Sequence, residues 1–172
     1  MHHFHFQPVD KEHLDLVHSW LKKPHVVKWF YGQGLQNTLD HLDAFLNGSC
    51  NSAYWLGFDG DHPFAFFITS FVLKPTDPLT RWCKEKGDTI TLDMLIGDTN
   101  YLGKGLSHIL IREFLLQQFP KAAEVLIDPE ASNLHAIHIY KKVGFEIVET
   151  FIPSHSPNPH YMMRLNTKKL IQ

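Results

Sequence analysis

Apolar residues recur along this chain with two spacings, one typical of strands and one typical of helices. Strand-like runs occupy residues 2–7, 53–58, 64–72, 89–96, 123–127, 145–152 and 160–165. Helical spacing, with apolar residues three and four positions apart, occupies residues 11–22, 38–46, 106–119 and 133–143. The pattern therefore predicts the order β-α-α-β-β-β-α-β-α-β-β.

Turn and cap residues support several of these boundaries. Asp10 and Ser132 are expected N-caps of the first and last helices. The Asp-Gly pair within residues 59–62 predicts a hairpin between the second and third strands. Residues 73–88 carry two prolines and several charges, which predicts a long loop. Residues 25–31, rich in aromatic side chains, are expected to connect the first two helices.

The strands at 89–96 and 123–127 are expected to be parallel, because the helix at 106–119 connects them. Such a unit crosses over with a right hand and binds ligands at the carboxyl end of its strands. The predicted site therefore lies where residues 89–96 end and the helix begins.

Composition narrows the choice of partners. A length of 172 residues with 44% apolar side chains predicts a single domain, residues 1–172, with a substantial core. A formal charge of −2 argues against a general nucleic-acid or anionic-membrane binder. The first six residues lack a signal peptide and no apolar run is near ~20 residues long, so a cytoplasmic protein is expected. Cys50 and Cys83 leave one disulfide possible, although a reducing compartment fits.

Thirteen scattered histidines raise the question of a metal. His135 and His138 lie i, i+3 on a predicted helix and could ligate one. Without a third ligand nearby, solvated or packing histidines are favoured, and no metal is expected.

A glycine turn follows the strand at 89–96. Gly103 and Gly105 permit backbone angles that other residues avoid, and they expose main-chain N–H groups. At the N-terminus of a helix such groups suit a phosphate or pyrophosphate, and Lys104 adds a cation. A turn that only needs small residues would give the same pattern.

One carboxylate falls in the middle of a strand that is apolar on both faces. Asp93 should face a cleft or have a partner, because an unpaired buried carboxylate is costly. The aromatic residues at 25–31, Trp29 among them, either line a substrate cleft or fill the core, and the core is favoured on the pattern alone.

Two separated motifs give the chain a resemblance to a known family. Residues 100–105 match the pyrophosphate loop Q/R-x-x-G-x-G/A, with Asn100 in place of Gln or Arg. The helix signature N-x-x-A-x-x-x-Y-x-x-x-G-F is matched in full by Asn133, Ala136, Tyr140, Gly144 and Phe145. With these motifs the chain resembles the GNAT superfamily of N-acetyltransferases. The resemblance implies an α/β (α+β) fold with a mixed, mostly antiparallel central sheet of about seven strands and helices on both faces.

From Trp20 to Met163 the chain looks like the aminoglycoside 6′-N-acetyltransferases, a group that confers antibiotic resistance. The likeness rests on residues 13–30, 101–106 and 128–137. Siderophore-pathway acetyltransferases acting on N-hydroxylysine share the early W-x-x-x-P-H segment, which begins here at Trp20, and are the alternative. A non-catalytic acyl-CoA-binding module is a third reading.

The resemblance implies acetyl-CoA as co-substrate and assigns residues to it. Pantetheine is expected at the backbone of Met94, Leu95 and Ile96. The pyrophosphate is expected at Leu102, Gly103, Lys104, Gly105, Leu106 and Ser107. Asn133 and Tyr140 lie seven positions apart, so they share a helix face that would point toward the thiol.

The remaining expectations concern the acceptor. Asp93 is the expected base, directly or through water, because a Lys-like amine with a pKa near ~10.4 costs roughly 4 to 5 kcal/mol to deprotonate at neutral pH. Tyr140 would protonate the leaving thiolate, or else be a core aromatic. Asp128 and Trp29 would bind a small cationic amine, although Asp-Pro also simply ends strands. No covalent intermediate is required, the loops at 25–35, 73–88 and 153–160 are expected to shape the cleft, and the protein is expected to be a monomer or homodimer.

Overall fold

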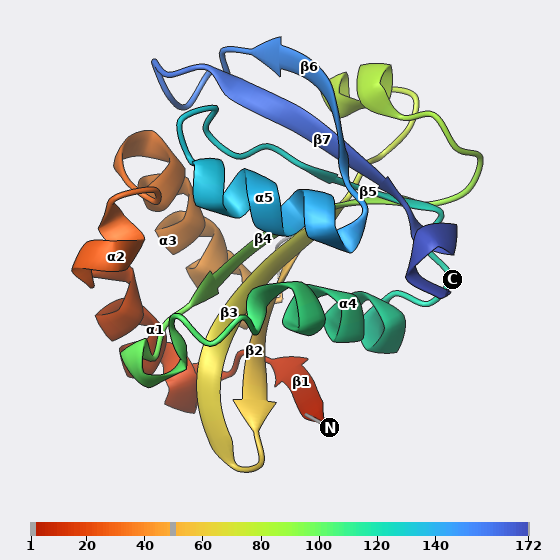
Figure 1. Cartoon of the computed structure of the whole chain (residues 1–172). Coiled ribbons are helices and arrows are strands. Elements are labelled where there is room, and N and C mark those ends of the chain that lie inside the picture. The colour runs from red at the N-terminus through yellow and green to blue at the C-terminus, as the bar shows by residue number, and fades with distance from the viewer. Residues whose placement is uncertain (1–2, 49–50, 172) are drawn as a thin grey trace.

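A mixed sheet of seven strands, in the order β1-β2-β3-β4-β5-β7-β6, forms the centre of the computed structural model, which describes residues 3–48 and 51–171 (Figure 1). The strands are β1 Phe4–Pro8, β2 Ser52–Asp59, β3 His62–Phe71, β4 Thr89–Ile96, β5 Glu124–Ile127, β6 Glu146–Phe151 and β7 His160–Asn166. All neighbours are antiparallel except β4 and β5. The predicted fold class and the parallel β4–β5 pair are confirmed.

Helices cover both faces of this sheet (Figure 1). They are α1 Leu14–Leu21, α2 Pro24–Val27, α3 Gly32–Leu46, α4 Ser107–Gln118 and α5 Leu134–Val143. Helices α1, α2 and α3 share one apolar cluster with β2 and β3, in which Trp20, Leu42 and Phe66 are buried. Helices α4 and α5 share the other, in which Phe67 and Phe114 stack with ring centroids 4.2 Å apart. Among the described residues, no helix is long and apolar enough to cross a membrane.

Some predicted boundaries are wrong. The aromatic connection at 25–31 contains the short helix α2, which Pro24 begins because proline suits the first helical position. Helix α3 starts at Gly32 and not at Thr38. Ser132 is not the cap of α5: Asn133 is, since its side-chain oxygen accepts from the backbone N–H of Ala136 at 3.3 Å. The beginning of the strand predicted at 2–7 and Cys50, half of the possible disulfide, lie outside the described residues.

The end of β4 is held by the last turn of α1 and the start of α2. The indole of Trp20 packs on Gly97, where a Cβ would lie only 1.9 Å from the ring. Five residues later, the His25 imidazole bonds the main-chain oxygen of Ile96 at 2.8 Å. A carbonyl oxygen only accepts, so Nε2 of His25 carries the proton. The two ends of the W-x-x-x-P-H segment thus contact consecutive residues at the carboxyl end of β4.

Strands β4 and β5 pair only briefly and then separate. Their parallel register covers Thr89 to Thr91, whereas β4 pairs with β3 as far as Ile96. The N–H of Gly97 bonds Phe64 O at 2.8 Å, and the N–H of Val72 bonds Thr89 O at 2.9 Å. Since main-chain bonding alternates along antiparallel strands, odd-numbered residues of β4 bond β3. The N–H and C=O of Met94 therefore point to the side where β5 has diverged.

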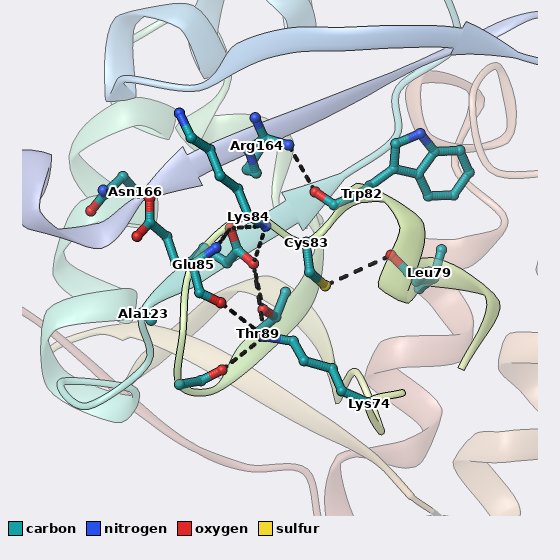
Figure 2. Close-up of polar contacts among 12 residues, drawn as sticks. Lys74, Leu79, Trp82, Cys83, Lys84, Glu85, Thr89, Ala123, Arg164 and Asn166 are labelled. Carbon is teal, nitrogen blue, oxygen red and sulfur yellow. Dashed lines mark hydrogen bonds and ion pairs between the residues drawn. The ribbon is translucent and has the colours of Figure 1, made fainter. Parts of the chain in front are cut away.

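Figure 2 shows Lys74, Lys84 and Glu85 of the loop at 73–88 together with Thr89 of β4. These residues contact the buried carboxylate of Glu124 on β5, to which the loop is attached. That carboxylate accepts bonds from the backbone N–H of Lys84 at 3.1 Å and of Glu85 at 3.2 Å, and from the Thr89 hydroxyl at 2.7 Å. The Lys74 ammonium lies 3.9 Å away and donates to Gly87 O at 2.8 Å. The Glu124 carboxylate thereby binds hydrogen-bond donors from both β4 and the loop.

Replacing Glu124 with alanine should destabilise the protein by about 2–4 kcal/mol, because several buried donors and a lysine lose their acceptor. Urea unfolding measures the loss. Glu146→Ala is the matched control: this carboxylate is exposed and bonds Lys169 at 2.9 Å, so its removal should leave the unfolding midpoint nearly unchanged. Equal midpoints for the two variants would contradict the anchoring role of Glu124.

Candidate active site

A cavity of about 850 Å³ opens where β4 leaves β5. Its wall is built from α2, the start of α3, β4, α5 and the segments around residues 128–133 and 155–160. Ten residues predicted for the site line it: Trp29, Asp93, Met94, Leu95, Ile96, Leu102, Ser107, Asp128, Asn133 and Tyr140. Gly103, Lys104, Gly105 and Leu106 do not line it.

The glycine turn lies beside the cavity, between two residues that do line it. Gly103 and Gly105 have φ values of +70° and +68°, angles that favour glycine. A Cβ at either position would meet nothing within 4 Å, so the main chain there is uncovered. Leu106 is buried in the core, which leaves only its main chain for a ligand. The helix α4 begins directly after this turn, with Ser107.

Two carboxylates and an imidazole meet on the cavity wall. Asp93 points into the cavity from β4 and is reached by solvent there, yet protein surrounds it on the other sides. This burial, with the nearby Asp128 carboxylate, raises the pKa of Asp93 to about 8, although His160 opposes the shift. Ionisation of Asp93 in the free protein is therefore disfavoured relative to that of a solvated aspartate.

His160, the first residue of β7, supports Asp128. Its Nδ1 donates to the main-chain oxygen of Asp128 at 2.7 Å and lies 3.2 Å from the Asp128 carboxylate. Burial lowers the pKa of His160, but its bonds to Asp128 outweigh that effect and leave the pKa above its ordinary value. Sequence reasoning missed His160, because no motif links a strand-initiating histidine to a strand end 32 residues earlier.

Tyr140 reaches the same cavity from α5. Burial raises the pKa of its hydroxyl, and Asp93 and Asp128 add to the shift. The phenol thus keeps its proton and can donate a hydrogen bond. On the same helix, Asn133 uses its side-chain oxygen for the cap, so its amide nitrogen is the group left to contact a ligand.

A second polar group at the cavity was also missed. Tyr31 donates to the Glu130 carboxylate, and Asn158 donates to the Tyr31 hydroxyl at 2.7 Å. These contacts join three segments of the chain beside the cavity, and Glu130 adds a third carboxylate to its wall. Contacts over 99 and 127 residues leave no local signal.

The expectation that residues 73–88 shape the cleft is wrong. The described cavity wall includes residues from the other two predicted loops but none from this one. The physical reason is the attachment of the loop to Glu124, which lies at the opposite end of β5 from Asp128.

Comparisons with known proteins show the family to which the chain belongs. The family model described as acetyltransferase (GNAT) domain matches residues 10–152. Aminoglycoside N(6')-acetyltransferase type 1 of Klebsiella pneumoniae is 31% identical over 142 residues, which cover 77% of this chain and 69% of that protein. The crystal structure of an aminoglycoside N(6')-acetyltransferase from Legionella pneumophila is 41% identical, with a TM-score of 0.88 over 98% of this chain and 94% of that one.

A more distant structure, the aminoglycoside acetyltransferase AAC(6')-Ib with coenzyme A and kanamycin, shares the fold. Its TM-score is 0.78 at 22% identity, over 98% of both chains.

Asp93→Asn should make the protein more stable at neutral and alkaline pH. The pKa of Asp93 in the folded protein lies above its ordinary value of 3.8, so ionisation favours the unfolded chain. This penalty is absent below pH 4, grows up to about pH 8 and is constant above. For a chain of this size each kcal/mol removed raises Tm by about 2–4 °C. Thermal scans from pH 5 to 9 should show the gap between variant and wild type widening with pH. The exposed Asp61→Asn is the control, and a gap that narrows with pH would refute the assignment.

Proposed function

The chain belongs to the GNAT family of acetyltransferases and is an acetyltransferase, and we propose that it transfers acetyl from acetyl-CoA to a primary amine of an aminoglycoside-like polycation. The observation that carries this proposal is the meeting of Asp93, Asp128 and Tyr140 in one cavity beside the open edge of β4. The printed names of the Klebsiella and Legionella relatives support the acceptor class.

The co-substrate would lie along the diverging part of β4. The N–H and C=O of Met94 point into the space that β5 leaves, and pantetheine amides need such partners. The N–H groups of the turn around Gly103 and Gly105, together with the start of α4, would hold the pyrophosphate. Lys104 would add its charge.

Acidic groups would select and activate the acceptor. Asp93, Asp128 and Glu130 line the cavity, which favours a substrate with several ammonium groups. A bound ammonium near Asp93 would lower the pKa of that carboxyl, so substrate binding itself would produce the ionised base. Asp93 would then take a proton from that ammonium, directly or through water, and leave a neutral amine whose nitrogen attacks the thioester carbonyl. As the N–C bond forms and the C–S bond breaks, the nitrogen loses a second proton.

Tyr140 would assist the departure of the thiolate. Its raised pKa keeps the hydroxyl protonated at neutral pH, so it can donate a hydrogen bond to the sulfur as charge develops there. The thiol finally receives the proton that the amine gives up. No protein nucleophile takes part in this direct transfer.

Acetyl-CoA and kanamycin or tobramycin should be turned over with release of free thiol, as a chromogenic thiol reagent detects. An N-hydroxylysine-type amine and a simple alkylamine are the comparison substrates. Absence of turnover across a panel of 6′-amino aminoglycosides would refute the acceptor class, and turnover of the hydroxylysine alone would favour the siderophore alternative.

Asp93→Asn should lower kcat by roughly 10²–10⁴-fold, the usual value of a general base, while acetyl-CoA binding by calorimetry stays unchanged. In the wild type, log kcat/KM should fall as pH drops below about 8, because the free carboxyl takes up its proton there. Retained activity in the variant would exclude Asp93 as the base.

Tyr140→Phe should cost about 10–100-fold in kcat, the equivalent of one hydrogen bond to a charged group.

A further inference from the structure

We propose that Tyr101 is a positioning residue for acetyl-CoA, and that the tip of the β2–β3 hairpin holds it so that the glycine turn is ordered before the pyrophosphate binds. The proposal rests on the proposed function, in which the main chain around Gly103 and Gly105 holds that group. Tyr101 does not line the cavity and would act through the turn that follows it.

The glycine turn depends on its two ends for its position. Residues 102–105 are exposed, and a Cβ at Gly103 or Gly105 would meet nothing within 4 Å. Glycine also loses more conformational freedom on ordering than any other residue. The turn ends at Leu106, which is buried in the core. On the other side it begins after Tyr101, whose side chain packs against the same core cluster.

The Tyr101 ring stacks on two rings of the β2–β3 hairpin. The Phe64 ring lies with its centroid 4.2 Å away and its plane tilted by 22°, and Phe64 is fully buried. The His62 ring lies 5.6 Å away and is tilted by 16°. The hairpin therefore fixes the plane of the tyrosine ring.

The hydroxyl of Tyr101 is bound by the same hairpin. It donates to the Asp59 carboxylate at 2.9 Å, and Asp59 is the last residue of β2. Burial raises the pKa of Tyr101, and Asp59 and Asp98 add to the shift, so the hydroxyl keeps its proton and remains a donor. Ring and hydroxyl are thus held by residues on both strands of the hairpin.

His62 also holds the short 3-10 helix η3, Thr99–Tyr101, in which the tyrosine lies. Its Nε2 bonds one oxygen of the Asp98 carboxylate at 2.6 Å, and the other oxygen accepts from the N–H of Asn100 at 2.9 Å. The N–H of Tyr101 donates to Asp98 O at 3.0 Å. The backbone that leads into the glycine turn is therefore connected to the hairpin through Asp98.

A turn that is already ordered loses less entropy when a ligand binds. Fixing the backbone of one residue corresponds to a factor of about 5–30 in an equilibrium constant. Loosening the turn should therefore weaken acetyl-CoA binding. The acceptor would be bound by other segments, so its KM and kcat should stay unchanged, which a general loss of folding would not allow.

The first test is calorimetric titration of the whole chain with acetyl-CoA. Tyr101→Ala should weaken binding by about 5–30-fold, since the turn loses its upstream support. Tyr101→Phe should weaken it by about two- to tenfold, the value of one hydrogen bond. Tyr161→Phe is the matched control, because Tyr161 is a half-buried tyrosine of β7 outside the cavity wall. Steady-state kinetics should show a higher KM for acetyl-CoA alone.

Two aspartates of the hairpin separate the hydrogen bond from the charge. Asp59→Ala and Asp61→Ala each remove one negative charge from the tip, but only Asp59 accepts the bond from Tyr101. Losing a negative charge favours an anionic ligand, so Asp61→Ala should bind acetyl-CoA at least as tightly as the wild type. Asp59→Ala should bind it less tightly. Combining Asp59→Ala with Tyr101→Phe should add nothing further, because the two residues share one bond.

Amide hydrogen exchange of residues 99–106 in the free protein provides a readout that needs no ligand. Exchange should be faster in Tyr101→Ala than in the wild type and unchanged in Tyr161→Phe. Unaltered exchange in Tyr101→Ala, wild-type affinity for acetyl-CoA in both Tyr101 variants, or an equal rise in KM for both substrates would overturn the proposal. Neither exchange nor acetyl-CoA binding depends on the acceptor, so failure of this role and failure of the proposed acceptor class can be told apart.

Discussion

The separation of β4 from β5 after three paired residues is the constraint on which the site depends. A parallel strand that continued to pair would use the main-chain groups of Met94 for the sheet, and the space for a ligand would close. The separation places uncovered backbone, the glycine turn and the N-terminus of α4 in sequence along one edge. Trp20 and His25 hold β4 in this position by packing on Gly97 and bonding Ile96 O, which is a physical reason for the W-x-x-x-P-H segment.

The half of the cavity proposed for the acceptor depends instead on carboxylates whose ionisation is energetically costly. Burial first, and the nearby Asp128 carboxylate second, disfavour the ionised form of Asp93 and raise its pKa. His160 moderates the cost by bonding Asp128. The ammonium group of a substrate would lower this electrostatic cost. The same electrostatics thus favours the proposed polyamine acceptors.

The sequence allowed the sheet, the parallel pair and most helices to be predicted, because their apolar spacing and caps are local signals. It also predicted Asp93, from a carboxylate within an apolar strand, and Asn133 and Tyr140, from the motif that carries the GNAT resemblance, and all three line the cavity. It could not reveal α2, whose four residues are too few for a helical period. It could not reveal the hydrogen bond from His160 to Asp128, nor that residues 73–88 lie away from the cavity. Both depend on contacts between distant segments of the chain.

The two halves of the cavity should therefore change differently under mutation. The proposed co-substrate half would use main-chain groups from one nearly continuous stretch, residues 94–107, where side chains can vary as long as the glycine angles and the β4 edge remain. The proposed acceptor half would use side chains from the segments around 25–38, 128–136 and 155–160, joined by contacts such as Tyr31 with Glu130 and Asn158. A substitution there removes charge or shape directly. Acceptor choice can consequently shift by single changes while acetyl-CoA use is preserved.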